Sequence, residues 1–510
     1  MRYHLTRTLV WEQQANLDHF PTHTIHQITL PPFAEYAILQ VNAITGTDHF
    51  ARLVQWMSML TILVGISEIA KRMGGSLRHQ LLASLLTISI PMVIAQSTST
   101  MNDLVVAGFL IIFINFAFRF KDNPKNLFYV GATGIALGLA FLSKSTAFIF
   151  ALPFSIWIAY RVIVKEGFGL SVFKVGGVIV MAALVINSGH FTRNINTFGS
   201  PLGNNLETVN EIFTTRSLSS NVIRNIQMHM PGVKGENPAL INLIGAGARK
   251  ITWNLHDLTG MDYEDPRTTY HNKYKGFASP GGFNTAEGRA GAFIHLCLIF
   301  FTGLFSKSKL KTRDQKQYLI LLVTTFLFFS FILKAQTPIN RLIMPLFVIW
   351  IPLISFTVYP SKKTYWYILP LMVWLCALPW LFNGKTRPLI RSEASAAAAW
   401  PSAGIEAYFV RKPSLHPIYD EITDFITETQ CKEIGVVFLH NEFFYEYPFW
   451  MMLREKGFDG KIQHMLVENE SKVHEDFSYS PCIIISNAEM NSFPEFSLTP
   501  YDQFLIYTKN

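Results

Sequence analysis

The sequence predicts a mainly α-helical fold: a polytopic transmembrane helix bundle with a small C-terminal α/β soluble domain. Of its 510 residues, 50% are hydrophobic and only 15% are charged, whereas a soluble globular domain carries about 25% charged residues. The apolar residues form blocks of roughly 16 to 22 residues, the length that a helix needs to cross a bilayer. Too few charges remain to cover a soluble surface, and a chain that crosses the membrane about ten times is expected.

Ten apolar blocks are the predicted transmembrane helices. They cover residues 51–70, 80–97, 104–119, 127–142, 146–163, 169–188, 291–306, 318–334, 341–358 and 364–382. Every second loop is basic, as in the loop with Lys71, Arg72 and Arg78. Short basic loops mark the cytoplasmic side, so both chain ends are predicted to face outward. We expect a multi-pass protein of the inner (plasma) membrane, with its C-terminal domain on the outer or periplasmic side.

Five regions follow from this topology, three of which lie outside the membrane on the outer face. They are an outer polar loop segment (1–50), an N-terminal transmembrane bundle (51–188), a long outer loop (189–290), C-terminal transmembrane helices (291–382) and an outer α/β domain (400–510). An amphipathic helix is predicted near 238–257. In the last region, helices are predicted at 416–430 and 447–457, and strands at 434–439 and 482–485.

Cysteine spacing and charge exclude several classes of protein. Of the four cysteines, Cys297 and Cys376 lie in apolar spans, and only Cys431 and Cys482 are candidates for a disulfide. The net charge of +8 is explained by the basic loops, so no nucleic-acid partner is expected. Three histidines, at 19, 23 and 26, have helical spacing but no accompanying carboxylate or cysteine pattern, and they are interpreted as loop histidines rather than metal ligands.

Charged residues at the membrane boundary are costly and are therefore candidates for function. Asp103 precedes an apolar helix; it could be an N-cap, a general base, or both. Lys144 lies in a turn between two spans and could reach the interface as an anchor or contact a phosphate. Arg341 begins another span, where it is either an interfacial anchor or a bidentate phosphate ligand. Glu35 follows a proline pair that introduces a short helix, and it either caps that helix, faces water or acts as a second carboxylate.

Several motifs resemble those of one family in their order along the chain. They are Tyr3-His4-Leu5-Thr6-Arg7, Trp11, Pro31-Pro32-Phe33-Ala34-Glu35, 50–56, Gln96 to Asp103, Leu142-Ser143-Lys144-Ser145, Gly189-His190 through Pro201, 220–225 and Asn340-Arg341-Leu342-Ile343-Met344-Pro345. Together they resemble the bacterial relatives of protein O-mannosyltransferases and lipid A aminoarabinose transferases, which are multi-spanning (GT-C type) glycosyltransferases. The resemblance covers nearly the whole chain.

The resemblance implies transfer of a sugar from a polyprenyl-phosphate donor to a lipid, glycan or protein acceptor on the outer membrane face, with inversion. The roles it implies are catalytic for Asp103 and Glu35, donor-phosphate binding for Lys144, Arg341 and Arg7, and acceptor or loop contacts for His4, Asn102, His190 and Glu287. Membrane lipids are further expected partners. No cofactor is firmly predicted, and whether a divalent metal is required stays open.

One departure from the family pattern leaves alternatives open. In the family, a first transmembrane helix ends in an acidic residue just upstream of the counterpart of Tyr3 and His4, and neither precedes those residues here. We therefore expect either an upstream segment missing from this chain or a protein that has lost the transfer reaction. The alternative functions are a polytopic transporter or flippase, and a catalytically inactive membrane scaffold. A transporter is disfavoured because no inverted repeat is visible.

Overall fold

The computed structural model divides into two compact units, each described by itself. It describes residues 3–122, 126–204, 206–231, 239–270, 285–286, 288–336, 339–359, 365–384, 387–390, 404–410, 412–438, 445–490 and 494–510. The mixed α/β unit comprises Met1–Ala51, Gly189–Asn204 and Ile390–Asn510, and the helical unit comprises Arg52–Ser188 and Asn205–Leu389. Each unit is therefore built from segments that are far apart in the sequence.

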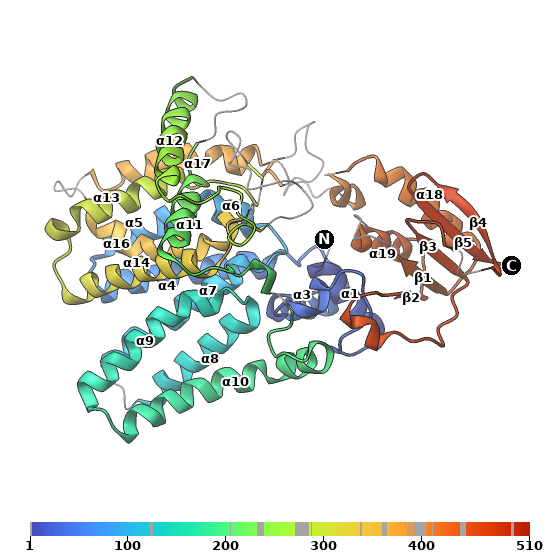
Figure 1. Ribbon diagram of the computed structural model, residues 1–510, viewed down its shortest axis with the longest axis horizontal. Helices are drawn as coiled ribbons and strands as arrows, with labels where there is room; N and C mark the ends of the chain where they lie inside the picture. The colour runs from blue at the N-terminus through green and yellow to red at the C-terminus, as the bar shows by residue number, and fades with distance from the viewer. Residues whose placement is uncertain are drawn as a thin grey trace. The chain divides into compact units, whose positions relative to one another are not determined.

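The helical unit holds a helix or helix pair at each of the ten predicted spans (Figure 1). They are α4 (Leu53–Arg72), α5 (Leu77–Ile88) with α6 (Pro91–Ser97), α7 (Asp103–Asp122), α8 (Leu127–Ser143), α9 (Ala147–Glu166), α10 (Leu170–Phe198), α13 (Phe293–Lys309), α14 (Arg313–Ile332), α15 (Ile339–Leu342) with α16 (Met344–Val358), and α17 (Ile368–Phe382). Of α10, residues 170–188 belong to the helical unit and the rest to the mixed α/β unit. Between α10 and α13 lie η1 (Leu206–Thr208), α11 (Thr215–Gln227) and α12 (Ala239–Asp257). The amphipathic helix predicted near 238–257 is confirmed as α12.

Within the described residues, four helices are long and apolar enough to cross a membrane, namely α4, α9, α10 and α14. The pair α5–α6 counts as a fifth if it forms one span, although it bends by 69°. Pro91 begins α6, and its ring cannot donate the N–H that would continue α5, which explains the break. Shorter apolar helices are α8, α16 and α17. The predicted membrane fold is thus confirmed.

Helix α7 lies in the core of the helical unit, where it packs against α4, α8, α9 and α16. Two glycines on α8 bring α10 close. A Cβ built on Gly134 would lie 2.9 Å from the Cα of Ile179, and one on Gly138 would lie 2.9 Å from the Cα of Ala183. Small residues permit such close packing of membrane helices. The α7–α8–α9 region therefore forms a closely packed support for the residues at the helix ends.

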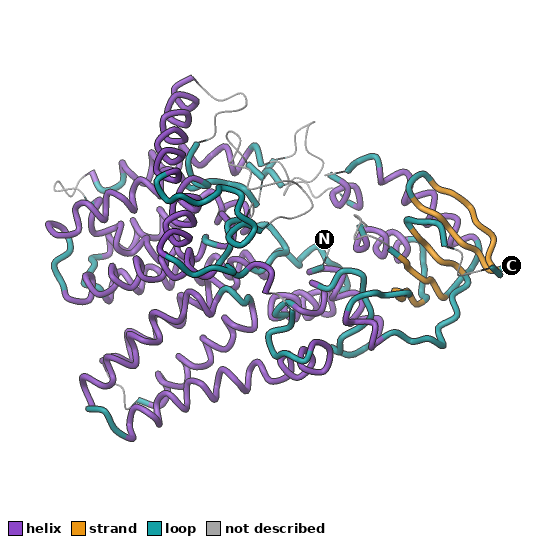
Figure 2. The backbone as a smooth tube through the Cα atoms, in the orientation of Figure 1, coloured by secondary structure: helices purple, strands orange, loops and turns teal. Residues whose placement is uncertain are grey.

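The mixed α/β unit contains all five strands of the described chain (Figure 2). Its elements are α1 (His4–Gln14), α2 (His26–Thr29), α3 (Phe33–Thr45), η3 (Ile405–Phe409), α18 (Leu415–Glu428), β1 (Glu433–Val437), α19 (Glu446–Glu455), β2 (Lys461–His464), η5 (Glu470–His474), β3 (Ile483–Ser486), β4 (Phe496–Tyr501) and β5 (Phe504–Lys509). The strand order is β2-β1-β3-β5-β4; β1 is parallel to β2 and β3, whereas β5 is antiparallel to β3 and β4. Both predicted helices and both predicted strands of this region are confirmed.

A disulfide joins Cys431 and Cys482, which confirms the only pairing that the sequence offered. These residues directly precede β1 and β3, two neighbouring parallel strands. The bond closes a separation of 51 residues, and such a link stabilises mainly by restricting the unfolded chain. Cys297 and Cys376 are free thiols in helices of the helical unit.

The N-terminal segment folds as part of the same unit as the C-terminal domain. The side-chain amide of Gln13 in α1 donates to the carbonyl of Ile462 at 3.0 Å and accepts from its N–H at 2.8 Å. Gln27 in α2 donates to Glu446 in α19 at 2.7 Å. Residues 1–50, which were predicted as a polar loop segment, thus contribute three helices, because their polar side chains are buried against residues distant in sequence.

Two buried histidines in this unit predict a pH-dependent stability. Burial lowers the pKa of both His19 and His23 from 6.5 to about 3, so each is neutral in the folded state. Below pH 6.5 the unfolded chain binds these protons first, and stability falls as the pH falls. Between pH 7 and pH 5 the loss is roughly 2 kcal/mol per histidine.

Amide hydrogen exchange of the β-strands, measured at several pH values on the detergent-solubilised protein, tests this expectation. Strand protection should weaken on acidification, and a His19→Gln, His23→Gln double variant should show a shallower dependence on pH. Equal slopes for the two proteins would show that other groups control the acid sensitivity.

Candidate functional site

Asp103, Lys144 and Arg341 converge in the helical unit from three separate stretches of chain. Asp103 is the first residue of α7, Lys144 lies in the turn between α8 and α9, and Arg341 belongs to α15. One carboxylate oxygen of Asp103 forms an ion pair with the Lys144 ammonium, and the other lies 3.4 Å from Nε of Arg341. The side chains are 2%, 15% and 18% exposed, respectively. The most buried member is thus the anion, with both cations partly open to solvent.

The beginning of α7 is capped by a residue other than Asp103. The side-chain carbonyl of Gln55, in α4, accepts hydrogen bonds from the N–H groups of Leu104 at 2.9 Å and Val105 at 3.2 Å. Gln55 in turn donates to Ser99 at 3.1 Å. Because Gln55 satisfies these donors, the Asp103 carboxylate is directed to the two cations rather than to the backbone. The interpretation of Asp103 as an N-cap alone is therefore disfavoured.

Asn102 fixes the geometry between the carboxylate and the lysine. Its side-chain amide donates to the carbonyl of Ser143, the last residue of α8, at 2.9 Å. This bond ties the residue before Asp103 to the residue before Lys144. Burial lowers the pKa of Lys144, and the neighbouring Asp103 charge opposes that effect. The Asp103 carboxylate thus favours the charged form of Lys144.

A buried polar network holds the segment that carries Arg341. Asn340 donates to the carbonyls of Met228 at 3.0 Å and Arg289 at 3.2 Å. Asn221 in α11 donates to the carbonyls of Ser330 at 3.0 Å and Leu333 at 3.2 Å, at the end of α14. The region between α10 and α13 therefore packs onto the α14–α15 connection and fixes it.

Arg224 is the centre of that packing. Its guanidinium is fully buried and donates to the carbonyl of Tyr263 at 2.9 Å, to Oγ1 of Thr269 at 2.6 Å and to Oγ1 of Thr268 at 2.9 Å. These bonds join α11 to residues 263–269 of the predicted long loop. The sequence predicted no role for Arg224 or Gln55, because a single polar residue leaves no periodic signal, either in a polar segment, as for Arg224, or in an apolar span, as for Gln55.

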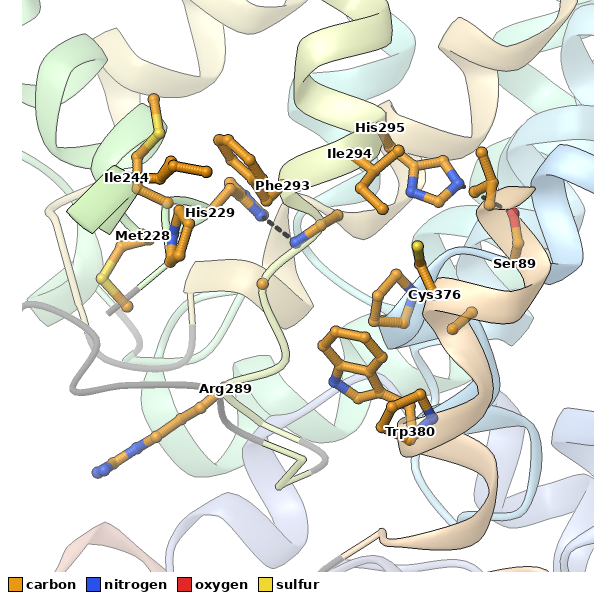
Figure 3. Close-up of a pocket in the computed structure, with 18 residues that line it drawn as sticks. Ser89, Met228, His229, Ile244, Arg289, Phe293, Ile294, His295, Cys376 and Trp380 are labelled. Carbon is orange, nitrogen blue, oxygen red and sulfur yellow. Dashed lines mark hydrogen bonds between the residues drawn. The ribbon is translucent and has the colours of Figure 1, made fainter. Parts of the chain in front are cut away.

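An apolar cavity of about 420 Å³ lies in the same unit (Figure 3). Residues 228–231, α13 and α17 supply most of its walls, including Phe293, Val373 and Trp380. Met228 and Arg289, whose carbonyls are bound by Asn340, also line it. The residue before Arg341 is thus bonded directly to the cavity wall, which connects the charged cluster to an apolar space.

Two buried histidines face this cavity (Figure 3). Nδ1 of His229 accepts from the N–H of Ala292 at 3.2 Å, so the proton of the neutral ring lies on Nε2. Nε2 of His295 lies 3.1 Å from the carbonyl of Leu86, which places its proton there. Neither His229 Nε2 nor His295 Nδ1 has a hydrogen-bond partner among the described residues. The two histidines that line the cavity thus carry one unpartnered donor and one unpartnered acceptor.

Glu35, His4 and Arg7 form a second cluster, in the mixed α/β unit. Oε1 of Glu35 lies 2.7 Å from Nδ1 of His4 and 3.5 Å from Nη1 of Arg7, and all three side chains are at most 1% exposed. Arg7 also donates to the backbone carbonyls of His26, Gln27 and Leu30. Burial opposes ionisation of Glu35, yet Arg7 and His4 hold its pKa below the ordinary value. These contacts describe an ion pair that joins α1, α2 and α3.

Two of the predicted residues, His190 and Glu287, remain to be placed. His190 belongs to the mixed α/β unit, where Nδ2 of Asn194 lies 3.3 Å from its Nε2. Glu287 lies outside the described residues. Among the side chains that the structure describes, no group of three or more His, Cys, Asp or Glu residues is placed to hold a metal ion.

Comparisons with known proteins agree with the fold and with the motifs. A family model described as dolichyl-phosphate-mannose-protein mannosyltransferase matches residues 29–189, and none of the curated proteins matches. ArnT from Cupriavidus metallidurans bound to undecaprenyl phosphate has a similar structure, with a TM-score of 0.54, 13% sequence identity and coverage of 99% of this chain and 92% of that one. ArnT in the apo state has a TM-score of 0.49 and 12% identity, with coverage of 99% and 92%. The resemblance predicted from the motifs is thus confirmed, and this chain has the ArnT-like GT-C fold.

Proposed function

We propose that this protein is a membrane glycosyltransferase that moves a sugar from a polyprenyl-phosphate donor to an acceptor on the outer membrane face, with inversion. The observation that carries the proposal is the cluster of Asp103, Lys144 and Arg341, linked through Asn340 to an apolar cavity. Two comparisons support it: the mannosyltransferase family match over 29–189, and the fold shared with an ArnT structure that holds undecaprenyl phosphate.

The cluster suits the charge changes of such a transfer. In the free protein, Asp103 compensates Lys144 and Arg341. A bound donor phosphate takes over these cations, which stabilise its charge as the bond from the sugar C1 to the phosphate oxygen breaks. The Asp103 carboxylate, released from the cations, then accepts the proton of the acceptor hydroxyl, whose oxygen forms the new bond to C1. A single displacement of this kind inverts the anomeric centre.

The apolar cavity fits the lipid portion of the donor. Its walls of Phe293, Val373 and Trp380 offer no charge to a polyprenyl chain. We propose that Glu35, His4 and Arg7 have a structural role in this reaction and that Asn102 positions Asp103 and Lys144.

The disulfide supports the orientation. Disulfides persist in oxidising compartments outside the cytoplasm, so we propose that the mixed α/β unit, with Cys431–Cys482, lies on the outer or periplasmic side of the inner membrane. A membrane-impermeant maleimide should label Glu468→Cys in intact spheroplasts when Cys297 and Cys376 are replaced by Ser. Labelling only after lysis would reverse the topology.

The transfer itself is tested with purified protein in liposomes. Labelled polyprenyl-phosphate sugars are supplied with lipid, glycan and peptide acceptors, and formation of a covalent product with free polyprenyl phosphate is measured by mass spectrometry. Movement of the intact lipid-linked sugar between leaflets, without a covalent product, would instead indicate a flippase. Neither activity, together with a stable partner on purification, would indicate a scaffold.

The change Arg341→Lys should raise the donor KM about tenfold or more, because lysine cannot present the two parallel N–H donors of a guanidinium to a phosphate. The charge is kept, so Asp103 retains its counterion and the protein should fold. Donor affinity is measured by titrating polyprenyl phosphate against turnover. Arg289→Lys is a matched control, since the Arg289 side chain points away from the other lining residues (Figure 3). Equal donor affinity in both variants would reduce Arg341 to an anchor.

A further inference from the structure

A second cavity, of about 390 Å³, lies within the mixed α/β unit. Its walls come from both ends of the chain: α1 and residues 19–21 on one side, and α19, β2 and the end of η5 on the other. Phe20 and Trp450 supply aromatic rings, and His19 and His474 supply imidazoles. Concave sites that combine aromatic walls with a few placed polar groups are typical of small-molecule binding.

Trp450 is one of the residues that line this cavity, and it carries an unsatisfied polar atom. The residue is 5% exposed, yet its indole N–H has no hydrogen-bond partner among the described residues. Buried donors are nearly always paired, so an orphaned one calls for a missing partner. Trp11, in the same unit, also has an unpartnered indole N–H but is not among the residues that line the cavity. Trp450 differs from Trp11 because it combines an unsatisfied donor with a place in the cavity wall.

Two histidines supply a matching donor and acceptor. Oγ1 of Thr197 lies 2.8 Å from Nδ1 of His19 and 2.8 Å from Nε2 of His474. A hydroxyl donates one hydrogen bond and accepts from the other ring. Whichever ring accepts the hydroxyl proton of Thr197, the two neutral rings keep one N–H and one unprotonated nitrogen. These are the nitrogens that do not contact Thr197, namely Nε2 of His19 and Nδ1 of His474. Burial keeps both histidine pKa values below 6.5 and thus favours the neutral forms.

The charge of the cavity wall is balanced. Lys461 and Asp476 are the charged groups that line it, apart from the histidines, and the Lys461 ammonium already lies 4.9 Å from the centre of the Tyr479 ring. One cation and one anion give no net attraction for a phosphate or a carboxylate. Aromatic rings, neutral donors and neutral acceptors instead suit a ligand with hydroxyl groups and apolar C–H faces.

We propose that this cavity binds an uncharged saccharide unit through Trp450, His19 and His474. The saccharide is either part of an acceptor glycan or a free sugar, since both offer the same hydroxyl groups. The site lies in the mixed α/β unit, whereas Asp103, Lys144 and Arg341 belong to the helical unit, so binding is expected without any transfer reaction.

The test uses the purified full-length protein in detergent and a panel of neutral mono- and oligosaccharides, followed by saturation-transfer NMR. Saturable binding is expected, and Trp450→Phe should weaken it about tenfold, the size of one hydrogen bond. The same change also removes part of the indole ring of a buried residue, so the melting temperature of the empty variant is measured to confirm that it is folded. Trp11→Phe, which removes the same atom away from the cavity, should leave binding unchanged. His474→Ala, a second lining variant, should also weaken binding.

Three outcomes would overturn the proposal: no saccharide binds, Trp450→Phe binds as tightly as the wild type, or inorganic phosphate displaces the saccharide. Preference for an oligosaccharide over its monosaccharides would identify an acceptor glycan, and equal affinity would identify a free sugar, both within the proposal. Binding that persists in an Asp103→Asn variant would show that this site stands apart from the proposed transfer. Loss of transfer without loss of saccharide binding would then bear only on the roles proposed for Asp103, Lys144 and Arg341, and the saccharide site would stand.

Discussion

Replacing Asp103 by Asn is expected to lower sugar transfer by about 10²- to 10⁴-fold, the range that a general base contributes. Asparagine keeps the size of the side chain but cannot take the acceptor proton, nor can it balance Lys144 and Arg341. Turnover is measured in liposomes at saturating donor, so that a change in donor affinity does not obscure the chemical step.

Folding of this variant is checked separately, because the two cations lose their counter-charge. Glu68→Gln provides a matched control, since Glu68 also pairs with two arginines, Arg72 at 2.6 Å and Arg119 at 3.3 Å, but at the other end of α4 and α7 from Asp103. The control variant should elute as a single species from a sizing column and retain wild-type turnover. Unchanged turnover in Asp103→Asn would remove this carboxylate from the mechanism.

Replacing Glu35 by Gln is expected to lower the free energy of unfolding of the mixed α/β unit by roughly 3–5 kcal/mol, the cost of leaving a buried charge uncompensated. Arg7 is at most 1% exposed, and Glu35 is its carboxylate partner there. Burial alone lowers the pKa of Arg7, and Glu35 opposes that effect. Hydrogen exchange of α1 and α3, followed by mass spectrometry in denaturant, measures the loss.

Glu12→Gln is the comparison for this change. Glu12 pairs with Arg454 at 3.0 Å, but its side chain is 52% exposed, so removal of its charge should cost no more than about 1 kcal/mol. The pair of variants also tests the role of Glu35. If Glu35 took part in catalysis, Glu35→Gln would lose turnover even in the protein that remains folded. If its role is structural, stability falls first and the remaining folded protein still turns over.

The membrane helices could be predicted from the sequence because each is an uninterrupted apolar run. Hydropathy also located α18, α19, β1 and β3, and the positive loops supported the count. Helices α5 and α6 were predicted as one span, because the apolar pattern continues through Pro91 although the backbone bends there. Strands β2, β4 and β5 were not predicted; β4 is mostly exposed, so its residues lack the apolar signal of a core strand.

Part of the candidate site was predictable because uninterrupted apolar runs also make the charges at their ends visible. Asp103, Lys144 and Arg341 stand out because each is a charge at the end of an apolar run. Asn102 and Arg224, which fix the surrounding segments, were harder to assign, because an amide and a guanidinium in polar stretches look like surface residues until their buried partners are known. Gln55 lies within the predicted span 51–70, where a lone amide does not indicate the helix end that it caps. The burial of His4 and Arg7 against Glu35 depends on how α1, α2 and α3 assemble, which no local pattern reports.

The composite origin of the mixed α/β unit has a consequence for biogenesis. Gln13 meets Ile462, and Thr22 meets Ser471, across a sequence separation of 449 residues in each case. The first helices are therefore synthesised long before their partners. Their contact surfaces stay uncovered while the membrane segments are inserted. A chain that stops short of the final hundred residues would leave the amino-terminal helices without their binding surface, which makes them early substrates for quality-control proteases.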